Sequence, residues 1–419
     1  MRKISVVSFA WNLILFCNVI SSTIGSRDLI GTIGARRNPQ CPAAFFNFGT
    51  SLTDTGNLLN ALPYSPDVIK FADAENPPYG NTFFRRPAKR YSDGRLIPDF
   101  FSLAFGFPLL DTYVSPTVFN FTHGVNFAIG GVGVTNQISA SQYLLPLQIK
   151  QFVRFQSSAL IAQSQPECLS SFDSLPPREN FQNALYTLEF GSSDLRSAVH
   201  GGVSSAVIFG DIIPTTVKKI ADSVTILYQY QARNFLIFNV YPLGCSPQTL
   251  TLLLTENLSK DKLGCIASVN EVADAYNREL FLKIGDLKAS LPDANIILFD
   301  FYNATTEVLQ NPSKYGFDSN STLKACCGAP GVGSYNFNPN VTCAIDGSIS
   351  CQNPDMYVSW DGVHFTDSFY GTVSRFILSG QFTSPSIDYD EICNLNFTNF
   401  PSSATYEKFY GGLCNVWYA

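Results

Sequence analysis

Histidine is scarce in this chain, which narrows the search for a general base. Only three histidines occur, at His123, His200 and His364. His364 stands in the stretch SWDGVHFTDSFY, three residues after Asp361. Positions i and i+3 of a turn face the same way, so the Asp361 carboxylate could accept the imidazole Nδ1–H and stabilise the charged ring. The alternative is that Asp361 caps a helix over 365–378 and that His364 lies at the surface.

The candidate nucleophile is Ser51, in the stretch AAFFNFGTSLTDTGNLL over 43–59. The first six residues are apolar except for Asn47, and the chain then turns at Gly49-Thr50-Ser51. A serine hydroxyl is a weak nucleophile unless a base takes its proton, and histidine suits that task near neutral pH. The pattern is compatible with a nucleophile at the tip of a strand and with an ordinary serine that starts a turn.

Several other chemistries lack their sequence signatures. The G-x-S-x-G elbow of the α/β-hydrolases, the H-E-x-x-H pair of metalloproteases and the Gly-Lys dipeptide of phosphate loops do not occur. The glycines at 130, 131 and 133 do not complete a dinucleotide-binding fingerprint. Zinc is disfavoured as the use of the cysteines, because the chain contains no pair of C-x-x-C knuckles.

Five short apolar runs, rich in Phe, Ile and Val, are expected to position the reactive residues. They span 43–48, 124–129, 184–190, 234–240 and 295–301. None alternates polar and apolar residues cleanly, which is typical of strands buried on both faces of a parallel sheet. Helical patterns lie between the runs, notably over 266–280 and over 204–231, where Pro214 marks a kink or a new start. The sequence therefore predicts an α/β sandwich with a parallel sheet.

The turns that follow these strands are the places to look for a site, because ligands collect at the carboxyl ends of parallel strands. Small-residue turns follow the first three, at 49–51, 130–133 and 191–194. Small residues there allow a backbone or a substrate to approach closely.

The bulk composition limits the class of protein. The chain has 419 residues, of which 45% are hydrophobic and 14% charged, and this is ample to bury a large core. The formal net charge is −6, and the longest basic patch is the short stretch FFRRPAKR at 83–90. A nucleic-acid partner is therefore not expected.

The first 25 residues are predicted to be a cleaved signal peptide. Arg2 and Lys3 precede an apolar stretch over 6–20, and small or polar residues follow up to Gly25. That stretch is short for a membrane anchor, and no later segment has the about 18 apolar residues that a spanning helix needs. Residues 26–419 are then expected to form one secreted domain, extracellular or with the vacuole as the alternative destination.

Cysteine usage agrees with an oxidising compartment. One of the eleven cysteines lies in the predicted signal, and an even count of ten remains. Cys245 is expected to pair with Cys265 across a short loop. A second cluster, whose pairing the sequence leaves open, comprises Cys326, Cys327, Cys343 and Cys351. It falls in a Gly- and Asn-rich stretch over 312–359 that is expected to be a disulfide-tied loop region.

Six Asn-x-Ser/Thr sequons add support for secretion, since that triplet is the acceptor of N-linked glycans. They are Asn120, Asn257, Asn303, Asn320, Asn340 and Asn396.

Seven short motifs together resemble the plant GDSL esterase/lipase family, a branch of the SGNH hydrolases. FNFGTSLTDTGN resembles the family's first block, F-G-D-S-x-x-D-T-G-N. The other six follow in the family's order: YSDGRLIPDF (91–100), VNFAIGGVG (125–133), LEFGSSDL (188–195), YPLGC (241–245), ACCG (325–328) and WDGVHFTD (360–367). The resemblance spans about residues 43 to 380.

The resemblance implies a three-layer flavodoxin-like sandwich with a five-stranded parallel sheet and a secreted carboxylic-ester hydrolase that works through an acyl-enzyme. Carried over by position, Ser51 would be the nucleophile, His364 the base and Asp361 the residue that orients it. The oxyanion hole would use the backbone N–H groups of Ser51 and Gly131 and a side chain at Ser193. No cofactor or metal is implied. The substrate would be a small-molecule or lipid acyl ester.

Four positions of the matched blocks bear on the serine turn and on the oxyanion hole. Asp54 and Asn57 match first-block positions that we interpret as supports for the serine turn. The family's Asp before the serine is Thr50 here, a mild change, because a Thr hydroxyl can still make local backbone bonds. The family's Asn in G-x-N-D is Ser193, a shorter donor, and losing an oxyanion donor costs about 10²–10³ in rate in a comparable hydrolase.

The substitution at Ser193 keeps two alternatives beside the ester hydrolase. One is an acyltransferase with the same three residues and an alcohol as the acceptor. The other is a catalytically weakened binding or defence protein that retains the fold. The sequence leaves the oligomeric state and the acyl length open.

Overall fold

The computed structural model describes most of the chain beyond its first 39 residues. The described ranges are 40–61, 73–114, 120–135, 144–164, 174–254, 257–395, 397 and 400. The predicted signal peptide, Cys168, Cys414 and the sequon residue Asn396 lie outside the described residues. Within these ranges, no helix is both long and apolar enough to cross a bilayer.

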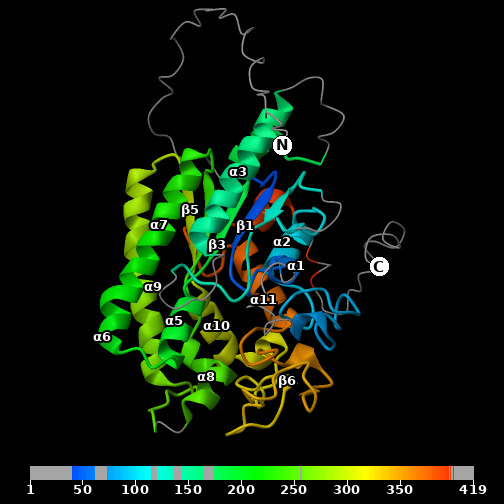
Figure 1. The fold of residues 1–419 in the computed structure, drawn as a ribbon, viewed down its shortest axis with the longest axis vertical. Coiled ribbons are helices and arrows are strands. Elements are labelled where there is room, and N and C mark those ends of the chain that lie inside the picture. The colour runs from blue at the N-terminus through cyan, green and yellow to red at the C-terminus, as the bar shows by residue number, and fades with distance from the viewer. Residues whose placement is uncertain are drawn as a thin grey trace, which may run out of the picture. The chain divides into compact units, whose positions relative to one another are not determined.

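A mostly parallel β-sheet forms the centre of the fold (Figure 1). Its strands are β1 (Phe45–Gly49), β2 (Gly124–Asn126), β3 (Leu185–Glu189), β4 (Asn234–Phe238), β5 (Asn295–Phe299) and β8 (Thr383–Ser384). They lie in the order β2-β1-β3-β4-β5-β8; the first five are parallel, and β8 pairs antiparallel with β5. The five predicted runs are thus confirmed as strands. The two-residue edge strand β8 is additional, and a strand that short carries no periodicity to detect.

Helices cover both faces of the sheet, which confirms the predicted three-layer α/β class (Figure 1). Helices α3 (Leu145–Gln163), α7 (Ile213–Gln229) and α9 (Ala267–Ser290) pack side by side on one face. Helices α2 (Ile97–Ala104) and α11 (Asp367–Leu378) pack together on the other. The connection from β1 leads to β2 at one edge of the sheet, whereas the later connections lead toward the other edge. Because such crossover connections are right-handed, connections in the two directions lie on opposite faces of the sheet.

Shorter elements fill the connections. They are α1 (Asn57–Ala61), α4 (Arg178–Asn183), α5 (Ser192–His200), α6 (Ser205–Val207), α8 (Pro247–Leu252), α10 (Phe301–Gln310), α12 (Tyr389–Cys393), β6 (Cys327–Gly328) and β7 (Ile349–Ser350). The helix predicted over 266–280 is confirmed and extends to Ser290. The pattern over 204–231 consists of α6, a π-helical turn at Ile208–Ile212, and α7. Pro214 is the second residue of α7 and follows directly on the π-helical turn, so the helical backbone continues through it without a break.

Aromatic side chains fill much of the core between the sheet and its helices. Phe46 of β1 stacks on Phe181 and Tyr186, with ring centroids 5.4 and 5.2 Å apart, and meets the edge of Phe152 from α3. Every residue of β1 and β3 is buried. Because both faces of these strands are covered, their sequences show no alternation of polar and apolar residues.

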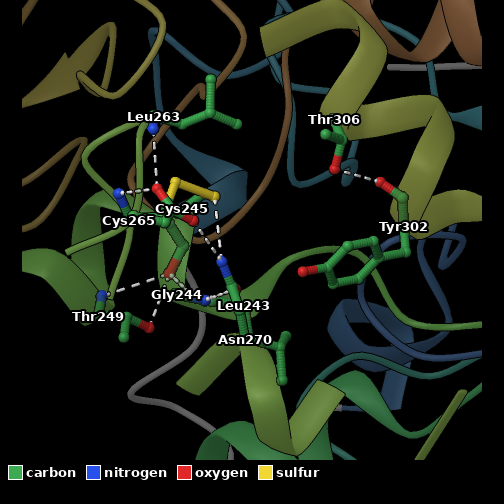
Figure 2. Close-up of a disulfide and its surroundings, with 11 residues drawn as sticks. Leu243, Gly244, Cys245, Thr249, Leu263, Cys265, Asn270, Tyr302 and Thr306 are labelled. Carbon is green, nitrogen blue, oxygen red and sulfur yellow. Dashed lines mark hydrogen bonds between the residues drawn. A yellow bond between two sulfur atoms is a disulfide. The ribbon is translucent and has the colours of Figure 1, made fainter. Parts of the chain in front are cut away.

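The predicted disulfide between Cys245 and Cys265 is confirmed (Figure 2). It closes the loop between β4 and α9. Beside it, the side chain of Asn270 accepts a hydrogen bond from the N–H of Gly244 at 2.8 Å. The start of α9 is therefore fixed to the loop after β4 by both a covalent and a polar link.

The cysteine cluster predicted in the loop region over 312–359 resolves into two disulfides. These are Cys326–Cys351 and Cys327–Cys343, and a further bond joins Cys41 to Cys393. The N–H groups of Cys326 and Cys327 donate to the carbonyls of Ser359 and Trp360, at 3.0 and 2.7 Å. The cross-linked loop thus supports the segment that leads into Asp361.

A buried ion pair joins the two helices on the second face. Arg95 and Asp367 are both fully buried, and the guanidinium donates through Nε and Nη2 to the carboxylate at 2.9 and 2.8 Å. The rings of Phe83 and Phe100 lie 4.2 Å from the guanidinium carbon. The pair connects the start of α2 to the start of α11, which follows directly on the segment of His364.

Replacing Arg95 with Met removes one partner of this pair and leaves a buried, uncompensated carboxylate. We expect Arg95→Met to lower the free energy of unfolding by about 3–5 kcal/mol, measured by urea denaturation. The double variant Arg95→Met/Asp367→Leu is the control and should recover part of the loss, because it removes the stranded charge. A loss below about 1 kcal/mol in the single variant would contradict this account.

The neighbouring carboxyl of Asp93 makes stability depend on pH. Asp93 is fully buried, and burial, with the negative charge of Asp367, raises its pKa to about 7. The folded state therefore binds this proton more tightly than the unfolded chain, whose Asp pKa is about 3.9. The stabilisation is complete below that value and is lost as the pH rises through about 7.

We expect the free energy of unfolding to fall by about 2–4 kcal/mol between pH 4 and pH 8. Urea titrations at several pH values measure this slope, and Asp93→Asn, which cannot ionise, should make it shallower; the raised pKa values of Asp54 and Asp194 leave a residual slope of the same sign. Stability that stays level or increases over that range would refute the assignment.

Candidate active site

The turn that carries Ser51 is fixed at the end of β1 by a side chain. The N–H of Gly49 donates to Gln148 Oε1 at 3.0 Å, and Gln148 Nε2 donates back to the Gly49 carbonyl at 2.9 Å. A Cβ on Gly49 would lie 2.1 Å from the hydroxyl of Thr53, so only glycine fits. Gln148, buried in α3, thus replaces a strand neighbour where the sheet ends.

The three residues predicted to act together form one chain of hydrogen bonds. His364 Nε2 lies 2.8 Å from Ser51 Oγ, and His364 Nδ1 lies 2.6 Å from Asp361 Oδ2. All three are nearly buried, with 7–9% of their surfaces exposed. The alternative interpretation of Asp361 is wrong, because Thr366 caps α11 by accepting from the N–H of Phe369.

The surroundings of Asp361 keep its carboxylate ionised. Burial alone would raise its pKa, but the positive charge and hydrogen bonds of His364, with the N–H of Val363, outweigh burial and lower the pKa to about 2. Its Oδ1 accepts the N–H groups of Val363 and His364 at 2.9 and 2.8 Å. An ionised carboxylate at Nδ1 can stabilise a protonated imidazole.

The predicted oxyanion donors lie in the turns after β1, β2 and β3. Gly131 is exposed and has a φ of +71°, a conformation that favours glycine. In the described part of the chain, neither its N–H nor that of Ser51 has an acceptor. Ser193, whose side chain is the predicted third donor, is half-buried in the first turn of α5. The N–H groups of Ser51 and Gly131 are therefore available to a ligand oxygen.

The other two histidines stand apart from this chain of hydrogen bonds. His200 Nε2 lies 3.0 Å from Thr249 Oγ1, and burial together with the charge of Arg196 lowers its pKa to about 4. His123 stacks on Phe107, with ring centroids 4.6 Å apart. Each has a local structural partner.

The sequence matches a known protein family over most of its length. A family model described as GDSL-like Lipase/Acylhydrolase matches residues 45–377. The chain belongs to this family.

Its curated relatives include plant proteins of similar length. They include the GDSL esterase/lipase At1g09390 of Arabidopsis thaliana, 35% identical over 84% of this chain and 91% of the relative. The GDSL esterase/lipase LIP-4 of the same plant is 35% identical over 91% of this chain and 99% of the relative. The GDSL esterase/lipase ENOD8 of Medicago truncatula is 32% identical over 86% and 92%.

In this GDSL protein the unusual Thr50 has a specific partner. Its hydroxyl donates to Glu189 Oε2 at 2.7 Å, and its N–H lies 3.3 Å from the same oxygen. Ser192 Oγ also donates to Glu189, at 3.3 Å. Burial raises the pKa of Glu189, and the bonds from Thr50 oppose that rise. Glu189 therefore ties the serine turn to the start of α5, a link that sequence reasoning missed.

The acidic residue of the first block, Asp54, accepts hydrogen bonds from two turns at once. Its Oδ1 accepts the N–H groups of Gly56 and Asn57 at 2.7 and 2.6 Å. Its Oδ2 accepts those of Leu58 and Gly130 at 3.0 and 2.8 Å. Asp54 thus joins the turn of Ser51 to the residue that precedes Gly131.

Asn57 reinforces the same junction. Its Nδ2 donates to the carbonyls of Asn126 and Ala128, at 2.8 Å each. Its Oδ1 accepts the N–H of Val114 at 2.8 Å. These contacts fit the predicted support of the serine turn by Asp54 and Asn57.

A buried aspartate fixes the glycine turn to α5. Asp194 accepts the N–H of Val134 at 2.9 Å, and a Cβ on Gly133 would lie 2.4 Å from its carboxylate. Burial raises the pKa of Asp194 to about 6, although the Val134 N–H opposes the rise. The segment of Gly131 and the helix of Ser193 are therefore held together.

Aromatic rings enclose the imidazole and its carboxylate. Tyr91 packs on His364 with ring centroids 4.9 Å apart, and Tyr79 meets the edges of Trp360 and Tyr91 at 5.8 and 6.2 Å. The Tyr79 hydroxyl donates to Asp361 Oδ2 at 2.9 Å. No local pattern in the sequence signals this contact, because the two residues are 282 positions apart.

A cleft of about 360 Å³ lies elsewhere, between α9 and the start of α10. None of the residues that line it belongs to the chain of Ser51. Its Asp300 accepts from Asn239 at 2.9 Å and from Asn303 at 2.6 Å. These polar groups serve the local fold, so the cleft is a poor candidate for the reaction.

Asp54→Asn tests the junction between the turns. The amide keeps one acceptor oxygen and turns an NH2 group toward backbone N–H donors. We expect the free energy of unfolding to fall by about 2–4 kcal/mol. We also expect displaced oxyanion donors to slow the reaction of Ser51 with a fluorophosphonate by roughly 10- to 100-fold.

The control is Asp388→Asn, which changes an exposed helix cap far along the chain at α12 and should leave both quantities unchanged. Wild-type reactivity of Ser51 in Asp54→Asn would show that the junction does not position the donors.

Proposed function

We propose that the protein is a secreted carboxylic-ester hydrolase that uses Ser51, His364 and Asp361 as its catalytic residues. The observation that carries the proposal is the continuous line of hydrogen bonds from Ser51 Oγ through both imidazole nitrogens to Asp361. Membership of a family of lipases and acylhydrolases supports ester chemistry.

The reaction begins with the transfer of the Ser51 hydroxyl proton to His364 Nε2 while Oγ attacks the ester carbonyl. The ionised Asp361 stabilises the imidazolium that results. The oxyanion accepts the N–H groups of Ser51 and Gly131. His364 then returns the proton to the leaving alcohol as the C–O bond breaks, which gives the acyl-enzyme.

Water completes the cycle. His364 takes a proton from the water that attacks the acyl carbonyl, and then returns a proton to Ser51 Oγ as the carboxylic acid departs. No metal or cofactor takes part in these steps. We expect a modest acyl ester of a small molecule or lipid as the substrate, rather than a long triglyceride.

Secretion is part of the proposal. The predicted signal peptide over 1–25 and the disulfides among the described cysteines support it. The described sequon residues are all exposed, as glycan acceptors must be; they are Asn120, Asn257, Asn303, Asn320 and Asn340.

Ser193 favours one second candidate, a binding protein that has lost part of its activity. A Ser hydroxyl reaches less far than the family's Asn amide, so the oxyanion relies more heavily on two backbone donors. In comparable hydrolases one missing donor lowers the rate about 10²–10³-fold.

A fluorophosphonate serine probe separates the two functions. We expect it to label the secreted protein on Ser51, by intact mass and peptide mapping, and not to label Ser51→Ala. Ser193→Asn should raise the rate of ester hydrolysis by about 10²-fold, because it restores the longer donor. Labelling of Ser193→Asn without labelling of the parent would favour the binding protein, and added alcohols would reveal acyl transfer.

A further inference from the structure

The carboxylate of Asp361 accepts four hydrogen bonds, as many as its two oxygens can hold. Two backbone N–H groups occupy Oδ1. Oδ2 is shared between His364 Nδ1, at 2.6 Å, and the hydroxyl of Tyr79, at 2.9 Å. Tyr79 therefore contacts the same oxygen as the imidazole that faces Ser51.

The segment around Tyr79 holds this hydroxyl in place. The N–H groups of Gly80 and Thr82 donate to the carbonyls of Ser92 and Asp93, at 3.0 and 2.7 Å. A Cβ on Gly80 would lie 2.1 Å from the carbonyl of Arg86, so the backbone there is closely packed. Only 3% of the Tyr79 surface is exposed. Burial, with the charge of Asp361, raises the Tyr79 pKa well above its usual value, so the hydroxyl keeps its proton.

We propose that Tyr79 is a positioning residue that acts on His364 through Asp361. Its hydroxyl helps to fix the position of Oδ2 beside Nδ1 and draws charge from that oxygen. A hydrogen bond to a carboxylate stabilises the anion and weakens its hold on a neighbouring proton. Tyr79 thus limits how strongly Asp361 binds the imidazolium, which helps His364 to give its proton to the leaving alcohol. The inference rests on the proposed function.

Other titratable groups lie near Asp361 and Tyr79 and contribute to the electrostatic potential there. Those that interact with Asp361, Tyr79 or the ring of Tyr91 are Asp54, Asp73, Glu75, Tyr241 and Tyr370. Of these, Asp73 interacts electrostatically with both Asp361 and Tyr79. None of these five donates to Asp361, so removal of the Tyr79 hydroxyl changes the carboxylate selectively.

Tyr79→Phe removes the hydroxyl and keeps the ring that packs on Trp360. Without that donor, Asp361 binds the imidazolium more strongly, so the acid limb of the pH profile should move up by about 0.5 pH unit. We expect kcat/KM above that limb to fall about 10-fold, because Oδ2 loses a restraint. A short-chain p-nitrophenyl ester serves as the substrate.

Tyr186→Phe is the matched control. Tyr186 is equally buried and donates its hydroxyl to the carbonyl of Phe181 at 2.6 Å, at the opposite end of β3. The Tyr186→Phe variant should be less stable than the wild type, but its pH profile of kcat/KM should be unchanged. Urea denaturation of both variants verifies that each is folded.

A second readout does not require turnover. With three histidines in the chain, the Cε1–H resonance of His364 can be followed by NMR and assigned with His364→Gln. Its titration midpoint should also rise by about 0.5 pH unit in Tyr79→Phe and stay constant in Tyr186→Phe. In an Asp361→Asn background, the Tyr79 substitution should cause no further shift.

The outcomes are distinct. If Tyr79→Phe lowers activity but leaves the midpoints of both the kcat/KM profile and the NMR titration unchanged, Tyr79 contributes packing alone. That result would overturn the proposal. So would a shift that persists in the Asp361→Asn background. A shifted NMR midpoint in a protein that hydrolyses no ester would uphold the coupling and overturn the proposed hydrolysis instead.

Discussion

The arrangement of the site depends on one buried carboxylate, Asp361, that has a donor for every acceptor position. A buried carboxylate with missing donors is costly, so each segment that supplies one is held to the same point. Its own loop supplies two N–H groups, His364 supplies the imidazole, and the segment of Tyr79 supplies a hydroxyl. The N–H groups of Cys326 and Cys327, in the disulfide-tied loop, donate to the carbonyls of the two residues before Asp361, Ser359 and Trp360.

Three further buried carboxylates do the same for the turns around Ser51. Asp54 joins the turns after β1 and β2, Glu189 joins Thr50 to the start of α5, and Asp194 joins α5 to the glycine turn. Strand pairing stops at the carboxyl ends of the strands, so backbone groups there need other partners. Acidic side chains that accept from two segments at once satisfy those groups and fix the distances between the turns.

Which features could be predicted from the sequence depends on how far apart along the chain the interacting residues lie. The strands were predictable because burial on both faces leaves continuous apolar runs. The local spacing of Asp361 and His364 made them a candidate pair but left a helix cap as the alternative, and it was the resemblance of the seven motifs that joined them to Ser51. Glu189 and Tyr79 were not predictable, because their partners lie 139 and 282 positions away and no periodicity links them. The pairing of Cys326 with Cys351 rather than with Cys343 likewise depends on how the loop folds back in space.

The 313 positions between Ser51 and His364 also set the order of events during synthesis. At about 5–20 residues per second, the serine is made about 15–60 s before the histidine that would activate it. Through that interval the growing chain can build most of its sheet, yet it carries a serine without a base, which is a weak nucleophile. Under the proposed mechanism, Ser51 gains its base only after His364 has been made, and a chain that ends before His364 has no base for this serine.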